Sequence, residues 1–106
     1  MNIIYDEKDK IYKAVKITDP RHNFLGLVFS DTPVELEIVN LEEKKPSYIN
    51  EPKLIDAVLK GIQEGSTHSN FPYTVHKILY VGSDSPWYEA YELLSFEIAQ
   101  EISRKK

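Results

Sequence analysis

The sequence contains 0 cysteines among its 106 residues. Their absence excludes disulfide bonds, thiolate metal sites, iron–sulfur clusters and cysteine nucleophiles. Glycine is also scarce, and its 4 residues form neither of the glycine-rich patterns that cradle phosphate groups. The longest apolar run covers residues 24–29, which is far shorter than the roughly 18 residues of a membrane-spanning helix. These absences disfavour nucleotide-binding, thiol-based redox and membrane-spanning functions.

The charge balance is acidic, with 13 Lys and Arg against 17 Asp and Glu and a formal net charge of −4. This is the wrong sign for a protein that binds nucleic acid by releasing counterions, so we expect no nucleic-acid partner. An acidic surface favours a basic protein partner instead. The first ten residues show neither the basic segment nor the apolar run of a signal peptide, and we expect a cytoplasmic protein.

The first half of the chain has the alternation typical of strands. Residues 11–18 place apolar side chains at alternate positions, and the proline-containing turn that follows makes 11–30 a predicted hairpin. Residues 2–5 fit a short edge strand. Residues 34–38 alternate strictly, which predicts a strand with three apolar side chains on a covered face and two glutamates in solvent.

The second half of the chain is predicted to form two helices with a strand between them. Asn50 is a suitable N-cap, apolar residues follow it at helical spacing, and Gly65 is a natural stop for the first helix. Residues 73–81 combine β-branched and aromatic side chains, which predicts a strand. The second helix is expected over 86–103, with Ser85 as its N-cap and a proline at its first position.

These elements predict an α+β fold: a mostly antiparallel sheet of four or five strands with two helices packed on one face, in the order β-β-β-β-α-β-α. We expect residues 1–106 to form a single domain. The stripe of the second helix that faces the sheet is predicted to consist of Trp87, Tyr91, Leu94, Ile98 and Ile102. Leu93 and Phe96 fall off this stripe, so we expect them to be exposed or covered by another molecule, such as the second copy of a homodimer.

Groupings of residues that could support catalysis are few. The three histidines show no metal-ligand spacing, and we expect neither a metal nor a cofactor. His22 or His76 could serve a small hydrolase or a ligand-binding protein, which requires a pocket with a group that titrates near neutrality. Glu35 and Glu37 share one strand face about 7 Å apart, a spacing that glycosidases use. Alternating glutamates on the solvent face of a sheet are far more common, so we expect no enzymatic activity.

Several short motifs of the second half resemble the fourth domain of translation elongation factor G. They are the helical stretch AVLKGIQEG at 57–65, the Phe-Pro pair at 71–72 and the Asp-Ser-Pro turn at 84–86 before the last helix. The resemblance covers residues 51–103. It implies two helices on one side of a sheet and, as one functional alternative, a translation-associated module.

The pattern as a whole favours a non-catalytic protein-binding module, such as an immunity protein or an antitoxin-like inhibitor that masks a basic partner. In such a module, acidic side chains would steer the encounter and aromatic side chains would hold the complex. The candidate binding residues are Glu35, Glu37, Glu42, Glu43, Asp84, Trp87, Tyr88 and Phe96.

Overall fold

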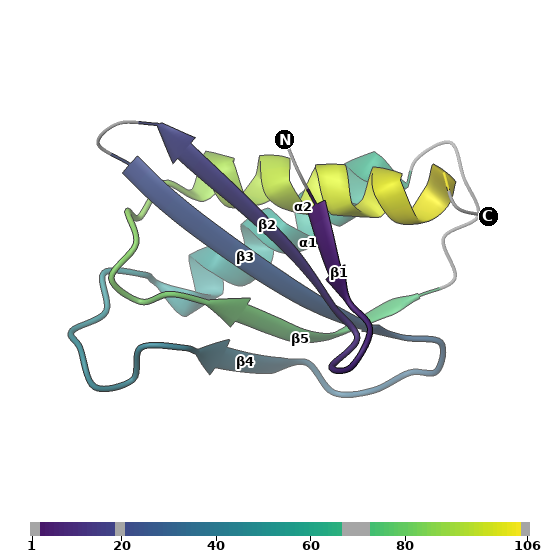
Figure 1. Cartoon of the computed structure of the whole chain (residues 1–106), viewed down its shortest axis with the longest axis horizontal. Helices are drawn as coiled ribbons and strands as arrows, with labels where there is room; N and C mark the ends of the chain where they lie inside the picture. The colour runs from purple at the N-terminus through teal and green to yellow at the C-terminus, as the bar shows by residue number, and fades with distance from the viewer. Residues whose placement is uncertain (1–2, 19–20, 67–72, 105–106) are drawn as a thin grey trace.

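Figure 1 shows one sheet and two helices arranged in two layers. The computed structural model describes residues 3–18, 21–66 and 73–104. Its elements are β1 (Ile3–Asp6), β2 (Ile11–Thr18), β3 (Arg21–Ser30), β4 (Glu37–Asn40), α1 (Glu51–Gly65), β5 (Thr74–Tyr80) and α2 (Tyr88–Arg104). Their order confirms the predicted α+β fold. Within this described part of the chain, no helix combines the length and the apolar character needed to cross a membrane.

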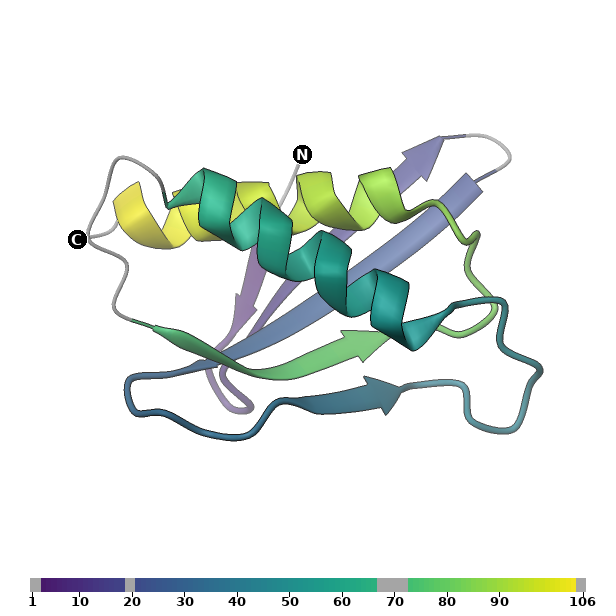
Figure 2. The ribbon, with the colours of Figure 1, turned by 180° about the vertical axis from the view of Figure 1, so that it is seen from behind.

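The five strands form one sheet in the order β1-β2-β3-β5-β4. All neighbouring strands are antiparallel except β4 and β5, which are parallel. Figures 1 and 2 show both helices on the same face of the sheet, so within residues 3–18, 21–66 and 73–104 the opposite face carries no helix. In Figure 2 the helices face the viewer, and the parallel strands β4 and β5 both point to the right with β5 above β4. When the view is turned so that both strands point up, β5 lies to the left of β4, and the β4–α1–β5 crossover is therefore left-handed. Nearly all such crossovers are right-handed.

Helix α1 has the limits predicted from its end residues. The Asn50 side chain accepts a hydrogen bond from the Lys53 N–H at 3.1 Å, which satisfies one of the free N–H groups of the first turn. At the other end the helix stops at Gly65, and the Ser66 N–H donates to the Ile62 carbonyl at 3.0 Å. The helix therefore has the predicted limits, but Gly65 has no positive φ, so it is not the left-handed stop that the sequence predicted.

Helix α2 begins at Tyr88, two residues later than predicted. The backbone of Ser85, the predicted cap, forms hydrogen bonds with residues of β3. Its N–H donates to the His22 carbonyl at 3.3 Å, and its carbonyl accepts from Asn23 Nδ2 at 2.8 Å. These bonds tie the loop before α2 to the sheet, so the helix starts beyond the loop and the predicted start at Pro86 is wrong.

Strand β4 covers 37–40 instead of the predicted 34–38. Leu36 and Ile38 pack against the core as the alternation predicted, but Val34 is exposed. Alternation records which side chains share a face. It does not predict which residues form backbone hydrogen bonds with the neighbouring strand, because that depends on the position of β5.

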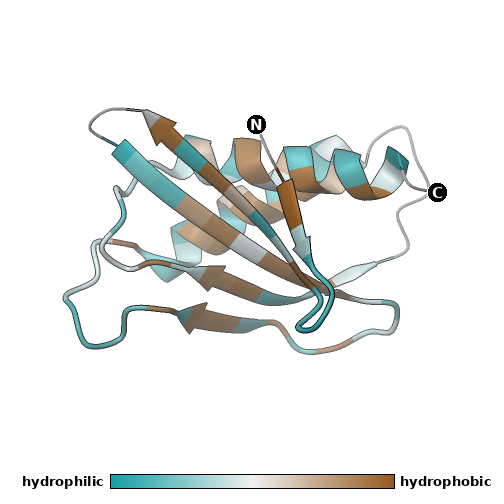
Figure 3. Ribbon diagram, viewed as in Figure 1, coloured by the Kyte–Doolittle hydropathy of each residue, from teal (hydrophilic) through white to brown (hydrophobic). Residues whose placement is uncertain are grey.

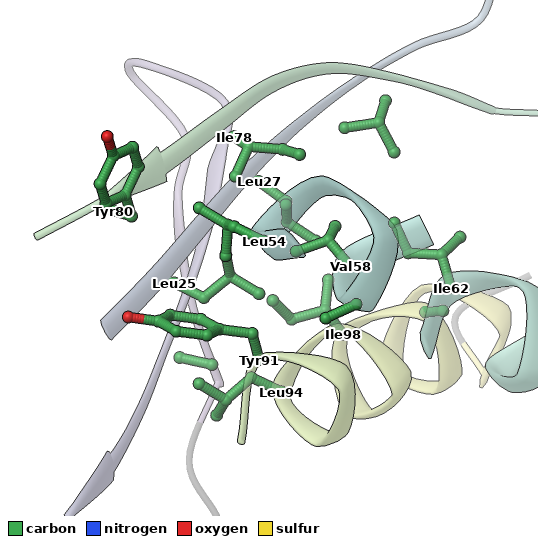
Figure 4. Close-up of a cluster of buried hydrophobic side chains, with 14 of the residues drawn as sticks. Leu25, Leu27, Leu54, Val58, Ile62, Ile78, Tyr80, Tyr91, Leu94 and Ile98 are labelled. Carbon is green, nitrogen blue, oxygen red and sulfur yellow. The ribbon is translucent and has the colours of Figure 1, made fainter. Parts of the chain in front are cut away.

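The core lies between the sheet and the two helices (Figure 4). The predicted stripe of α2 is confirmed for Tyr91, Leu94, Ile98 and Ile102, which are all buried. Trp87 precedes the helix and is half-buried. The sheet and α1 contribute Leu25, Leu27, Leu54, Val58 and Ile78 to the same cluster.

Truncation of Leu94 tests the rotation of α2 about its axis. Leu94 is fully buried, so we expect Leu94→Ala to lower the free energy of unfolding by about 2–5 kcal/mol through lost burial and the cavity that remains. Leu93→Ala is the control, since Leu93 is 37% exposed, and should lower it by less than about 1 kcal/mol. Urea denaturation measures both values. Equal losses for the two variants would show that the helix faces the sheet differently.

Candidate protein-interaction site

Three of the eight predicted binding residues lie along the β4 edge of the sheet. Glu35 is exposed in the extended segment before β4, and Glu43 is exposed in the turn after it. Glu37 is the first residue of β4, and its Oε2 lies 3.9 Å from Lys77 Nζ on β5. All three carboxylates are accessible to solvent, but no aromatic candidate lies among them.

Glu42 lies where the loops that follow β4 and β5 contact each other. Its Oε2 accepts a hydrogen bond from the Ser83 hydroxyl at 2.7 Å. The Asn40 Oδ1 atom joins the same loops by accepting from the N–H groups of Glu42 and Gly82, at 2.9 Å each. Glu42 therefore helps to hold the two loops together.

The Asp84 carboxylate turns toward the sheet. Its Oδ2 accepts a hydrogen bond from the Phe24 N–H at 2.8 Å, beyond the last pairing of β3 with β5. Burial raises the pKa of the Asp84 carboxyl and the negative charge of Glu42 adds to the rise, whereas the Phe24 hydrogen bond and the charge of His22 oppose it. Asp84 thus fastens the loop before α2 to β3.

Trp87 and Tyr88 are neighbours in sequence with different surroundings. The Trp87 ring is covered by Arg21, whose guanidinium carbon lies 4.7 Å from the ring centroid, and by Lys16, whose Nζ lies 5.7 Å away. The Tyr88 hydroxyl accepts a hydrogen bond from the Asn50 N–H at 2.9 Å, which joins the starts of the two helices. Both rings therefore have contacts within the chain.

Phe96 borders a shallow groove of about 260 Å³ between α1 and α2. Leu93 shares the groove and is 37% exposed. We call the groove, which is lined by Glu64, Glu89, Glu92, Leu93 and Phe96, the acid-ringed groove. Leu93 and Phe96 lie off the stripe of α2 that packs on the sheet, and Glu64 comes from α1, which runs in front of α2 in Figure 2.

Two glycines of α1 allow the helices to approach closely at this point. A Cβ atom added at Gly61 would overlap the Ser95 hydroxyl and the Glu92 carbonyl oxygen, and one added at Gly65 would lie 2.7 Å from the Phe96 carbonyl oxygen. Real Cβ atoms essentially never make contacts this short. The last two turns of α1 therefore lie directly against the backbone of α2.

The charge at the groove is predominantly negative. Lys60 Nζ lies 3.5 Å from Glu92 Oε1, and Glu64 and Glu89 add two further carboxylates to the lining. An exposed ion pair of this kind contributes only about 0–1 kcal/mol, so Lys60 can exchange its partner at little cost. The arrangement suits an apolar group that carries positive charges beside it.

Sequence reasoning identified Leu93 and Phe96 but missed the carboxylates around them. Glu89 and Glu92 stand four residues before Leu93 and Phe96 respectively, which places each pair on one helix face. This spacing was available in the sequence. Glu64 belongs to another helix, and only the contact between α1 and α2 brings it to the groove.

A second cleft, of about 440 Å³, lies near the C-terminal end of α2 and is lined by Tyr5, Lys10, Tyr12, Phe29, Ser30, Asp31, Tyr73 and Ile102. Its rings pack on one another: the ring centroids of Tyr5 and Tyr12 are 4.5 Å apart, and Phe29 meets Tyr12 edge-on at 6.0 Å. Burial raises the pKa of the Tyr12 hydroxyl. None of the eight predicted binding residues lines this cleft.

The two histidines of the hydrolase hypothesis lie far apart on the sheet. His22 is exposed near the start of β3, and His76 lies near the start of β5, at the opposite end of the antiparallel pair. Among the described residues, the His76 Nδ1 atom is buried without a hydrogen-bond partner. Residues 3–18, 21–66 and 73–104 contain no group of three or more His, Asp or Glu that could hold a metal ion.

Gly61→Ala tests the close approach of the helices. The added methyl group meets the Glu92 carbonyl oxygen, which belongs to the backbone and cannot rotate away. We expect the variant to lose about 1–3 kcal/mol of unfolding free energy, although alanine is the better helix former. The exposed neighbour provides the control, and Lys60→Ala should change stability by less than about 0.5 kcal/mol. A stabilised Gly61→Ala protein, measured by denaturation, would mean that the helices are further apart.

Asp84→Asn tests the charge of the loop before α2. The raised pKa means that the folded protein holds the Asp84 proton more tightly than the unfolded chain does, so acidification through that pKa favours folding. As the pH falls from about 7 to about 4, the wild type should gain stability relative to Asp84→Asn. The variant keeps an oxygen for the Phe24 N–H but does not titrate. Urea denaturation at each pH measures the difference, and a trend in the opposite sense would contradict the assignment.

The acid-ringed groove combines an exposed leucine and a half-buried phenylalanine with an excess of one charge. It holds Phe96 from the predicted set and Leu93 from the predicted homodimer contact. Such a surface can recognise a partner by shape and charge. No family model, curated protein or solved structure matches this chain.

Proposed function

We propose that the protein is a non-catalytic binding module whose acid-ringed groove holds a basic, amphipathic segment of a partner protein. The observation that carries this proposal is that Glu64, Glu89 and Glu92 line the same groove as Leu93 and Phe96. The module works in the cytoplasm, in keeping with a chain that contains 0 cysteines. By covering a basic surface it acts as an immunity or antitoxin-like inhibitor.

The charge of the groove favours a basic partner over a second copy of this chain. A homodimer through Leu93 and Phe96 would be a two-fold contact, in which the same patch faces itself. The carboxylates of one copy would then lie opposite those of the other, and like charges across an interface cost several kcal/mol. A partner with Lys or Arg beside an apolar side chain would instead be attracted by the glutamates that line the groove.

The apolar and acidic residues of the groove would contribute to binding in different ways. Leu93 and Phe96 offer apolar area that a partner side chain can remove from water, and a fully buried side chain of this size contributes about 1.5–3 kcal/mol. The carboxylates at the rim remain partly in water, where they raise the rate of encounter more than the final affinity. Binding should therefore need both the apolar contact and low or moderate salt.

The experiment uses two synthetic helical peptides of about 15 residues. One carries Leu and Phe anchors flanked by Lys and Arg, and its matched counterpart has Glu in place of every Lys and Arg. We expect the basic peptide to bind the wild type, with an affinity that falls as salt is added, and Leu93→Lys to weaken it about tenfold or more. Fluorescence anisotropy measures both affinities.

The control variant is Leu59→Lys. Leu59 lies on α1, is 45% exposed and does not line the groove, so this variant adds the same charge elsewhere and should bind like the wild type. The three proteins also serve as baits in cell extract, where a basic partner should be retained by the wild type and Leu59→Lys and lost by Leu93→Lys. Equal binding of both peptides, or equal affinity of all three proteins, would refute the proposal.

A further inference from the structure

The face of the sheet that carries no helix is largely apolar. Ala14, Leu25, Leu27 and Ile78 point toward the helices and are buried, so the residues that alternate with them on each strand point the other way. We call this surface the open sheet face, and its apolar members are Ile4, Ile11, Val15, Ile17, Phe24, Val28, Val39 and Leu79. Figure 3 views the sheet from this side, with hydrophobic segments on its strands.

The open sheet face has an ordered apolar centre. A Cβ atom added at Gly26 would lie 3.2 Å from Ile11 Cγ2, 3.3 Å from Leu79 Cβ and 3.5 Å from Phe24 Cζ. These three side chains, from three strands, therefore close over the space that the glycine leaves. They form a thin apolar layer, and no helix or strand of the described residues lies above it.

Apolar side chains also lie toward the β1 edge of this face, around Lys13, which stands between Gly26 and Ile4. Ile4 is 64% exposed, Ile17 is 63% exposed and Val15 is 45% exposed. A single exposed apolar residue is ordinary, but Ile17 and Val15 lie on the same face of β2 beside Phe24, and a cluster of this kind indicates a surface that another molecule covers. This face lies on the opposite side of the sheet from the acid-ringed groove.

The charges on this face are balanced, in contrast to those of the groove. Lys13 Nζ lies 3.4 Å from Asp6 Oδ2 at one side, and Lys77 Nζ lies 3.9 Å from Glu37 Oε2 at the other. Each ion pair leaves little net charge where it lies, so two copies of this face can meet there with little repulsion. The face offers no reason for a partner of strongly acidic or basic character.

The size of the open sheet face is adequate for a weak or moderate dimer. Five strands spaced about 4.8 Å apart span about 19 Å, and the 8-residue β2 extends about 26 Å. Each copy thus offers roughly 500 Å² of projected area. Two copies together reach about 1,000 Å², which is near the minimum for a biological interface and in the range of weak, transient contacts.

We propose that the open sheet face is the contact surface of a homodimer in which two sheets pack face to face about a two-fold axis. Sheets that pack in this way lie about 10 Å apart and interdigitate their side chains. The helices of both copies then point outward, so both acid-ringed grooves stay free. The dimer does not depend on the proposed function of the grooves, but it would let one assembly hold two partners.

Sedimentation equilibrium tests this proposal on the intact chain. We expect the wild type to show a concentration-dependent dimer. Ile17→Lys and Ile4→Lys should each weaken the dimer about tenfold or more. Each substitution removes an isoleucine that the dimer would bury and places a positive charge on the contact surface of both copies. Both positions are more than 60% exposed in the single chain, and thermal unfolding should show that both variants remain folded.

Two variants with the same substitution on the helix side separate the possible outcomes. Leu59→Lys and Leu93→Lys should dimerise like the wild type. Loss of the dimer in Leu93→Lys with retention in Ile17→Lys would place the contact at the groove and overturn the proposal. A wild type that stays monomeric at about 1 mM, where even a millimolar Kd produces dimers, would also overturn it.

Discussion

The close contact between α1 and α2 at Gly61 and Gly65 is the constraint on which both surfaces of the molecule depend. A Cβ atom at either position would meet the backbone of α2, so the two helices lie against each other on one face of the sheet. That contact brings Glu64 beside Phe96 and forms the acid-ringed groove. It also keeps both helices on one side, which leaves the other face of a five-stranded sheet without cover.

The parts of the fold that local sequence specifies were predictable. Strand β2 matches its predicted range of 11–18, and α1 begins after Asn50 because an N-cap acts within one turn. The helix also ends at Gly65 as predicted, but this glycine has no positive φ and lies against the Phe96 backbone, so the predicted reason for the stop is wrong. The errors lie where a distant residue decides. Ser85 resembles a helix cap, but its backbone is bound by β3, more than 60 positions earlier in the sequence. The hand of the β4–α1–β5 crossover is likewise a property of the assembled sheet.

The candidate site was predictable to the same extent and for the same reason. The helical wheel places Leu93 and Phe96 off the buried stripe, and the spacing of Glu89 and Glu92 sets them beside those two residues. Nothing in the local sequence indicates that Glu64 joins them. Nor does the charge of a carboxylate predict its direction: Asp84 turns inward to Phe24 N–H because β3 has a free donor there that only the fold reveals.

The two exposed apolar surfaces differ mainly in charge, and charge is what distinguishes their partners. Burial of leucine or isoleucine is favourable against any apolar surface, so apolar area alone selects no partner. At the groove, three carboxylates belong to the lining, which makes self-association costly and a basic partner favourable. On the open sheet face, two balanced ion pairs remove that cost, and a second copy becomes acceptable. A chain with a net charge of −4 can therefore associate with itself and with a basic partner through opposite sides, because its excess charge is not spread evenly between them.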